Sequence, residues 1–306
     1  MSSTCEMCRA SAGFVPLAVG RDYLVGKDNA TFRAVRCPVC GFAFLECHPK
    51  DLSTYYSRRY FLAGQAAMPA AVHVSRFLLA REAHRVAKDV PSASRILEIG
   101  PGHGYFLNAL AAAYPQARLW GFDITQEARL ERTLSPRISV RYARDLREAE
   151  FDEKQFDLIV MRHALEHVPH LRAFLEEVGR VGAECSTLYV KVPNRASWAA
   201  RVFGPYWNGM DFPRHLYYFT PKELGRLLSD VDFRRLRVGH EGDAIDWVGS
   251  TRFWLTAHGI TCTGRWKRLS EMLFLGLRVG LLPLGLAARA RRASSRIWIL
   301  AQRTER

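Results

Sequence analysis

The chain has 306 residues, of which 48% are hydrophobic and 24% are charged, and its formal net charge is +14 at pH 7. This composition excludes an intrinsically disordered chain, and the length allows one large domain with a small appendage. The first twenty residues lack the basic start and apolar stretch of a secretory signal, and no run of 18 apolar residues occurs. We therefore expect a cytoplasmic protein.

Two C-x-x-C pairs, CEMC and CPVCG, lie in residues 1–50 and are separated by 28 residues. Each pair can present two thiolates to one ion, and two pairs complete the tetrahedral four-sulfur site that structural zinc prefers. We therefore expect a small zinc ribbon over residues 1–50, with free buried thiols as the alternative. The predicted zinc ligands are Cys5, Cys8, Cys37 and Cys40.

Residues 51–94 are expected to form a linker and cap helices, because apolar residues recur there with a period near 3.6. The main domain is expected over residues 95–306. It opens with RILEIGPGHG, a short apolar strand followed by a glycine loop and a helical pattern, and strands and helices then alternate. This order is typical of an α/β fold with a mostly parallel sheet and helices on both faces.

Three further segments follow that alternation. A loop rich in aromatic residues at 193–220 leads into a helix with Thr220 as its expected N-cap and Pro221 at its first position. A strand, a helical insertion at 244–290 and a last strand, SRIWILAQR, complete the predicted domain.

The glycine loop contains Gly100, Gly102 and Gly104, where the absence of side chains lets a ligand approach the backbone. Glu98 precedes the loop; its charge disfavours a phosphate and suits a cationic ammonium group. Asp123 ends the next strand, where a carboxylate can accept hydrogen bonds from both hydroxyls of a ribose. These residues together predict S-adenosylmethionine (SAM) as the ligand.

The segments LEIGPGHG, GFDI, ARDL and FDLIVMRHALEHV together resemble the sequential motifs of class I SAM-dependent methyltransferases, over about residues 90–192. The resemblance implies a Rossmann-like fold with a seven-stranded sheet. It also implies that the glycine loop holds the methionine part of SAM, Asp123 the ribose and Asp145 the adenine amino group, with two residues at the end of the fourth strand lining the pocket. The implied cofactor residues are Glu98, Gly100, Gly102, Gly104, Asp123, Asp145, Met161 and His163.

The segment HALEHVPH has two interpretations. If it is helical, His163 and His167 share one face with Glu166 beside them, as in a metal-binding pair. Some quinone and small-RNA methyltransferases use a Glu-x-x-Glu-His pattern here for a divalent ion, and His163 stands in place of the first acid. Many metal-free methyltransferases also carry LEHV, where Glu166 and His167 shape the pocket.

The cysteine pairs, YYSRRYF and RHLYYFT together resemble a narrower group, the methyltransferases with an N-terminal zinc ribbon from glycan and natural-product pathways. Relatives among the nucleotide-sugar C-methyltransferases have E-H-L-x-Y-F-S at the last motif, so Arg214 stands in place of their glutamate. The resemblance implies a nucleotide sugar or other small or glycan-type acceptor, with His215 as general base. We expect Tyr217, Tyr218 and either Tyr56 or Tyr60 to shape the acceptor pocket.

Arg214 could pair with a phosphate or carboxylate of the substrate, as an arginine fork does well. The catalytic candidates are His215, Tyr218, Arg214 and His167.

The positive charge is concentrated at the end of the chain, where residues 252–306 contain eleven Lys or Arg and two Glu. They surround the apolar stretch 271–292, which predicts either contact with an anionic membrane or polyanion, or a helix pair covering the core. Two other functions stay open: an RNA methyltransferase that uses this basic surface, and a non-catalytic SAM-binding or zinc-ribbon interaction protein. The oligomeric state does not follow from the sequence.

Overall fold

The computed structural model describes residues 4–26, 29–56, 60, 69–125, 134–241, 244–260 and 266–304, with the backbone alone for 69–74 and 266–271. Within the predicted alternation of strands and helices, the segment TQEARLERTL at 125–134 is expected to be a helix, and its residues 126–133 lie outside the described residues.

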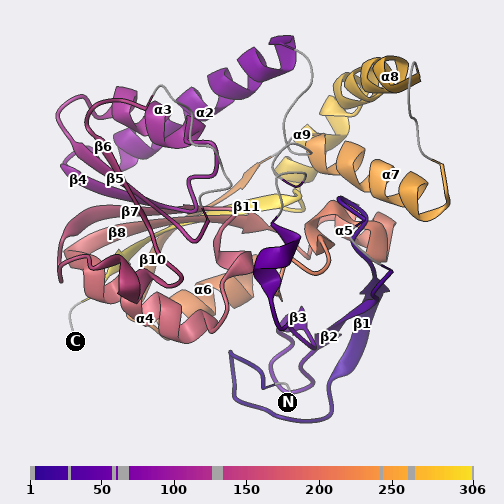
Figure 1. The fold of residues 1–306 in the computed structure, drawn as a ribbon, viewed down its shortest axis with the longest axis horizontal. Helices are drawn as coiled ribbons and strands as arrows, with labels where there is room; N and C mark the ends of the chain where they lie inside the picture. The colour runs from indigo at the N-terminus through magenta and orange to yellow at the C-terminus, as the bar shows by residue number, and fades with distance from the viewer. Residues whose placement is uncertain are drawn as a thin grey trace. The chain divides into compact units, whose positions relative to one another are not determined.

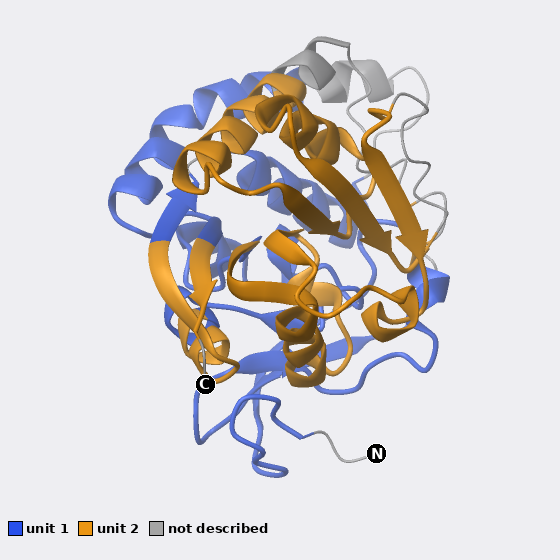
Figure 2. Ribbon diagram, turned by 90° about the vertical axis from the view of Figure 1, so that its left-hand side faces the viewer, with its two compact units in different colours: residues 1–55, 192–224, 238–298 blue, residues 56–191, 225–237, 299–306 orange. Residues whose placement is uncertain are grey.

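The chain divides into two compact units (Figure 2). Unit 1 comprises residues 1–55, 192–224 and 238–298, and unit 2 comprises residues 56–191, 225–237 and 299–306. The domain boundaries expected at residues 50 and 94 stay a prediction.

A seven-stranded sheet with the order β10-β11-β8-β7-β4-β5-β6 has most of its residues in unit 2, and parts of three of its strands fall in unit 1. Its strands are β4 (Arg95–Ile99), β5 (Arg118–Asp123), β6 (Ile138–Tyr142), β7 (Phe156–Arg162), β8 (Gly182–Pro193), β10 (Phe233–Glu241) and β11 (Arg296–Arg303). β4 pairs in parallel with β5 and β7, β5 pairs in parallel with β6, and β7 with β8. This sheet confirms the predicted mostly parallel, seven-stranded architecture.

Helices cover both faces of this sheet. α2 (Pro69–Asp89) and α3 (Tyr105–Ala113) pack together on one face, and α4 (Leu171–Val181) lies on the other (Figure 1). The central strands β4 and β7 are buried along most of their length, from Ile96 to Ile99 and from Leu158 to Met161, as expected for strands covered on both sides. Because these strands are parallel, the loops after β4, β5 and β7 leave the sheet at its carboxyl edge, where open α/β sheets bind ligands. The 3-10 turn η2 (Leu146–Ala149) follows β6, and the 3-10 turn η3 (Leu165–His167) lies in the loop after β7.

A small antiparallel sheet with the order β1-β2-β3-β9 belongs to unit 1. Its strands are β1 (Val15–Gly20), β2 (Phe32–Arg36), β3 (Ala43–Leu45) and β9 (Tyr217–Tyr218). The last strand comes from the loop at 193–220, and the ring of Tyr217 stacks on that of Phe42 with centroids 5.9 Å apart. The cysteine-rich segment therefore shares its sheet with the proposed acceptor loop.

Short helices complete unit 1: η1 (Leu52–Tyr55), α5 (Trp198–Phe203), η4 (Gly204–Tyr206), η5 (Asn208–Met210), α7 (Ile245–Ala257), α8 (Trp266–Gly280) and α9 (Leu282–Ala290). The chain passes from unit 1 to unit 2 within α6 (Pro221–Ser229). At the start of α6, the Thr220 hydroxyl accepts from the Glu223 amide (3.3 Å), and the Glu223 carboxylate accepts from the Thr220 amide (2.9 Å). This capping box confirms the helix start expected from the sequence.

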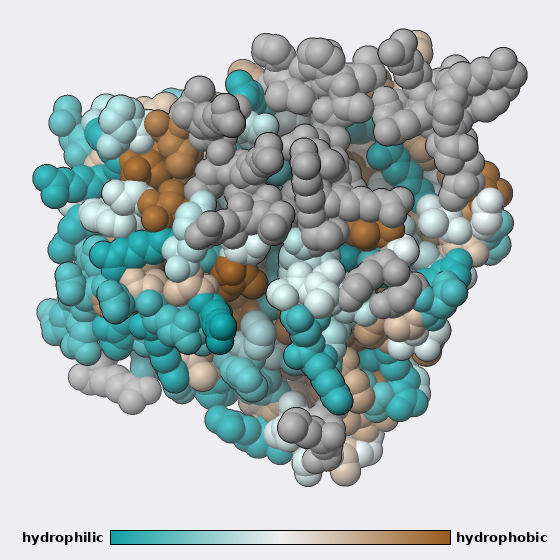
Figure 3. Space-filling view, viewed as in Figure 1, coloured by the Kyte–Doolittle hydropathy of each residue, from teal (hydrophilic) through white to brown (hydrophobic). Residues whose placement is uncertain are grey.

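Hydrophilic residues surround separate hydrophobic patches on the face drawn in Figure 3. Within the described part of the chain, no one helix is both long enough and apolar enough to cross a bilayer. The segment Met272–Gly280 of α8 and the helix α9 meet that criterion only as a pair, with a bend of 41° between them.

Candidate functional site

The glycine loop after β4 leaves its backbone uncovered at the carboxyl edge of the sheet. Gly100, Gly102 and Gly104 have φ values of 70°, 53° and 73°, which glycine adopts without strain. A Cβ on Gly100 would lie 2.9 Å from the Cβ of Ala164, whereas a Cβ on Gly102 would meet nothing within 4 Å. The loop is therefore packed on one side and open on the other, which leaves room for a ligand.

Glu98 lies at this loop with only 2% of its surface exposed. Its Oε2 atom has no hydrogen-bond partner among the described residues. Burial raises the pKa of Glu98 to about 8; the charge of Arg162 lowers it, and those of Glu82 and Asp123 raise it further. A buried carboxylate oxygen without a donor suits a ligand that brings a cationic N–H group.

Asp123 faces the same loop from the end of β5. Its Oδ1 accepts from the Thr125 amide (3.2 Å). Burial raises the pKa of Asp123, while backbone hydrogen bonds from Thr125, Gly102 and Ile124 lower it. The bond from Gly102 brings Asp123 to the glycine loop, and the charge of Asp123 acts on Glu98, so the three lie near one another; their cofactor roles stay a prediction.

The other predicted cofactor residues occupy different environments. Asp145 is exposed and caps the 3-10 turn η2 by accepting from the Arg147 amide (2.9 Å). Met161 is fully buried in the sheet, in register with Ile99 of β4. His163 is half-buried directly after β7. The adenine role of Asp145 and the pocket roles of Met161 and His163 stay predictions.

The segment after β7 forms the single 3-10 turn η3 instead of an α-helix. The i, i+4 spacing that would place His163 and His167 on one helical face is therefore absent. His163 Nδ1 lies 3.3 Å from Oε1 of the fully buried Glu166, and His167 Nδ1 lies 2.8 Å from the Tyr56 hydroxyl. The expectation of a helical metal-binding pair is wrong in this respect, because a turn replaces the helix it requires.

A buried ionic cluster next to Glu98 escaped the sequence analysis. Glu82 of α2 accepts two hydrogen bonds from Arg162 (3.0 and 3.1 Å), one from Lys191 Nζ (3.0 Å) and one from the Tyr189 hydroxyl (2.8 Å). Burial opposes ionisation of Glu82, but the charges of Arg162 and Lys191 hold its pKa well below the usual range. The one sequence signal was Lys191 inside the otherwise apolar strand TLYVKVP.

His215, in the loop at 193–220, is buried in unit 1. Its Nδ1 lies 2.8 Å from the carbonyl oxygen of Gly209, and a carbonyl only accepts, so Nδ1 carries the hydrogen. Burial lowers the pKa of His215; Asp211, whose Oδ2 is 4.0 Å from Nε2, has the opposite effect. The imidazole is therefore neutral, with its lone pair on Nε2, as a general base requires.

Arg214, beside it, is fully buried and paired within the protein. Its Nη2 donates to Asp22 Oδ1 (2.7 Å) and Asp211 Oδ1 (2.6 Å), and its Nε donates to Asp211 Oδ2 (3.0 Å). The expected pairing with a substrate anion is disfavoured by this geometry, because two aspartates already occupy the guanidinium. Tyr218 is also buried, and its hydroxyl donates to the carbonyl of Met210 (3.4 Å).

The four predicted zinc ligands form one cluster, with Cys5 and Cys40 sulfurs 3.6 Å apart and Cys8 and Cys37 sulfurs 3.5 Å apart. A tetrahedral zinc ion with Zn–S distances of about 2.3 Å separates its sulfurs by about 3.8 Å. The donor set and spacing therefore fit zinc.

The two cysteine turns have matching backbone geometry. The amide of Arg9 donates to the Cys5 carbonyl (2.8 Å), as the amide of Gly41 does to the Cys37 carbonyl (2.9 Å). Arg9 and Gly41 both have positive φ values, 64° and 80°. Burial acts to raise the pKa of Cys37, but backbone hydrogen bonds from Cys40 and Val39 outweigh it and lower the pKa; at Cys5 and Cys40 burial dominates and the pKa of each thiol is raised. Amides directed at a sulfur stabilise a thiolate, as a metal ligand requires.

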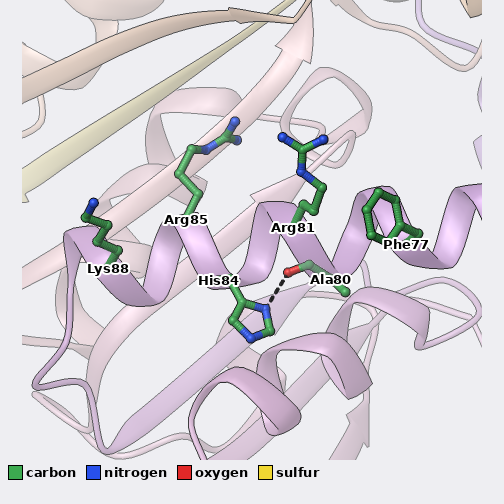
Figure 4. Close-up of a pocket in the computed structure, with 6 residues that line it drawn as sticks. All are labelled: Phe77, Ala80, Arg81, His84, Arg85 and Lys88. Carbon is green, nitrogen blue, oxygen red and sulfur yellow. Dashed lines mark hydrogen bonds between the residues drawn. The ribbon is translucent and has the colours of Figure 1, made fainter.

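An open depression of about 490 Å³ lies along α2 (Figure 4). It is lined by Phe77, Ala80, Arg81, His84, Arg85 and Lys88. All of these residues come from one helix, and His84 is tied to the carbonyl of Ala80 (2.8 Å). None of the predicted cofactor residues lines it, so we do not assign it to the cofactor.

Comparison with known proteins shows which family has a sequence similar to this chain. Residues 71–238 match the family model described as a methyltransferase domain. The chain is 30% identical over 183 residues to proteins from two strains of Mycobacterium tuberculosis that are named as probable S-adenosylmethionine-dependent methyltransferases. The match covers 60% of this chain and 57% of those relatives, so the chain spans little more than half of their length.

Two solved structures have a similar fold. A SAM-dependent methyltransferase from Archaeoglobus fulgidus aligns with a TM-score of 0.50 at 17% identity, covering 74% of this chain and 94% of that one. Human N-acetylserotonin methyltransferase in complex with SAM aligns with a TM-score of 0.52 at 15% identity, covering 84% of this chain and 60% of that one.

Proposed function

Because this chain belongs to the class I SAM-dependent methyltransferase family, we propose that it transfers the methyl group of SAM to a small or glycan-type acceptor such as a nucleotide sugar. The observation that carries the proposal is the pair of acids, Glu98 and Asp123, on either side of a glycine loop whose backbone is open at Gly102.

The residues of unit 2 fit SAM by their chemistry. The buried Oε2 of Glu98 has no donor among the described residues and suits the ammonium group of the methionine part. Asp123 can accept hydrogen bonds from the ribose hydroxyls, and the glycine loop admits the chain that joins the two groups. When bound, SAM supplies an electrophilic methyl group on a positively charged sulfur, and the protein's task is to position the acceptor and remove its proton.

We assign proton removal to His215. Its hydrogen bond to the Gly209 carbonyl fixes the tautomer with the lone pair on Nε2. Its pKa is lowered from 6.5, so the imidazole is neutral at pH 7 and can accept a proton. His167 is the alternative base, because the Tyr56 hydroxyl holds its ring by Nδ1.

The two histidines are distinguished by His215→Ala and His167→Ala, each measured for turnover and for SAM affinity by calorimetry. We expect His215→Ala to lower kcat at least about 100-fold with the Kd for SAM unchanged, since general bases typically contribute 10²–10⁴-fold. Turnover near wild type in His215→Ala, with loss in His167→Ala instead, would move the base to His167.

The acceptor class is tested by incubating the full chain with SAM labelled in its methyl group and a panel of nucleotide sugars, quinols, small phenols and RNA. We expect label in a nucleotide sugar or related small acceptor. Label in RNA instead, with binding that weakens steeply as salt rises, would replace the proposal with the RNA alternative. SAM binding without transfer to any member of the panel would favour the non-catalytic alternative.

A further inference from the structure

Helices α8 and α9 of unit 1 expose a nearly continuous row of large apolar side chains. The exposed fractions run from 37% at Leu277 to 65% at Leu273. The row consists of Met272, Leu273, Leu275, Leu277, Val279, Leu282 and Leu286. Soluble surfaces rarely gather so many exposed aliphatic groups in one place unless the patch binds something.

The inward side of α8 is identified by its packing. Phe274, Arg278 and Leu281 are half-buried at spacings of four and three residues, which is one face of a helix. The guanidinium of Arg252 on α7 lies over the Phe274 ring at 4.3 Å. Arg278 is the only charged residue from 272 to 288, and it lies on this half-buried side. The outward face of α8 from Met272 onward therefore contains no charged side chain.

Cations follow directly at the end of α9. Arg289, Arg291 and Arg292 are exposed, and no described carboxylate pairs with them. An apolar face bordered by arginines is complementary to the surface of an anionic bilayer. The apolar side chains can enter the hydrocarbon region, and the arginines can pair with the phosphate headgroups.

We propose that the outward face of α8 and α9 docks this chain onto the surface of an anionic lipid bilayer. The pair lies flat on that surface instead of crossing it. α8 and α9 meet at an angle of 41°, so together they do not form one straight span across a bilayer. The chain after α9 is also fixed to unit 1: the Trp198 amide donates to the Ala293 carbonyl (3.0 Å), and the Asn194 side chain donates to the Ser294 carbonyl (2.8 Å).

Two other occupants fit less well. A two-fold contact with a second copy would cover the apolar side chains but would supply no anionic partner for the arginines beside them, since residues 272–288 contain no Asp or Glu. RNA recognition uses aromatic stacking and polar contacts, which the aliphatic side chains of this face do not provide.

The test is sedimentation of the full chain with vesicles of phosphatidylcholine alone or mixed with phosphatidylglycerol, at low and at high salt. We expect apparent binding at least about tenfold tighter to the anionic vesicles, weakened by salt. The variant Leu273→Glu/Val279→Glu should bind at least about tenfold more weakly. The matched control, Val19→Glu/Val202→Glu, introduces the same charges at exposed valines elsewhere in unit 1 and should bind like wild type.

Circular dichroism and the unfolding midpoint establish that each variant is folded. A second variant, Arg289→Gln/Arg291→Gln/Arg292→Gln, leaves the apolar face intact and should lose the preference for anionic lipid. Equal, salt-independent binding to both vesicle types would overturn the proposal. So would a dimer, seen by light scattering, that dissociates in Leu273→Glu/Val279→Glu without any binding to vesicles. None of these outcomes depends on methyl transfer, so they are independent of the proposed function.

Discussion

Replacing Glu98 with glutamine should stabilise the ligand-free protein and weaken SAM binding. The carboxyl group is fully buried, and its pKa is raised from 4.5 to about 8, chiefly by burial. The native state therefore favours the protonated form. The stability associated with Glu98 is fully present below its unfolded pKa and is lost as pH rises toward 8.

The magnitude follows from linkage at about 1.36 kcal/mol per pKa unit. Wild type should lose about 2 kcal/mol by pH 6 and about 5 kcal/mol by pH 9, relative to a neutral group at this position. Glu98→Gln carries no such titration. Its advantage in the free energy of unfolding should therefore grow by about 3 kcal/mol from pH 6 to pH 9.

Urea unfolding of both proteins at pH 6 and pH 9, without SAM, measures this difference. Calorimetry at pH 7.5 measures the Kd for SAM, which should rise at least about tenfold in Glu98→Gln because a bound ammonium group favours the ionised form of Glu98, whereas the amide cannot ionise. A stability difference that does not change with pH would refute the buried-carboxyl account. Unchanged SAM affinity would refute the ammonium assignment.

Three further substitutions test other parts of the structure. Glu82→Gln should lower the free energy of unfolding by about 3 to 5 kcal/mol, because buried cations lose their anion; an unchanged urea midpoint would contradict this. Arg214→Met should be destabilising by a similar amount if the guanidinium is structural, whereas wild-type stability with a raised KM would restore the substrate-binding role. Cys37→Ser should reduce zinc, measured by mass spectrometry, from one ion per chain toward zero, and Cys47→Ser should retain it. Zinc retained in Cys37→Ser would count against the four-cysteine site.

The parallel sheet and the glycine loop could be predicted from the sequence because their signals are local. LEIGPGHG contains the end of a buried strand and the glycines that take positive φ values, and the next helix begins at the following residue, Tyr105. The same holds for the capping box at Thr220, whose two partners are three residues apart.

Pairing between distant residues could not be predicted in this way. Arg214 is neutralised by Asp22, which lies 192 positions away in the chain, and Glu82 of α2 meets Lys191 of β8 across 109 positions. Such pairs produce no periodic pattern in the sequence. The sequence therefore gives no sign that Asp22 pairs with Arg214, and Arg214 beside His215 in an aromatic loop is interpreted as a substrate contact. The segment at His163 was ambiguous for another reason, since three residues are too few to distinguish a 3-10 turn from the start of an α-helix.

The backbone pairing of β3 with β9 bears on how enzymes of this kind can be recombined. Ala43 and Phe44 pair with Tyr218 and Tyr217, and Arg195 donates to the carbonyl of Gly41 (3.3 Å). A chimera that receives only the loop at 193–220 from a relative would set foreign residues against the host's cysteine turns. We propose that this loop shapes the acceptor pocket, so acceptor preference should be inherited, or engineered, as a block that joins residues 1–55 to that loop, although more than 130 residues separate them in the gene.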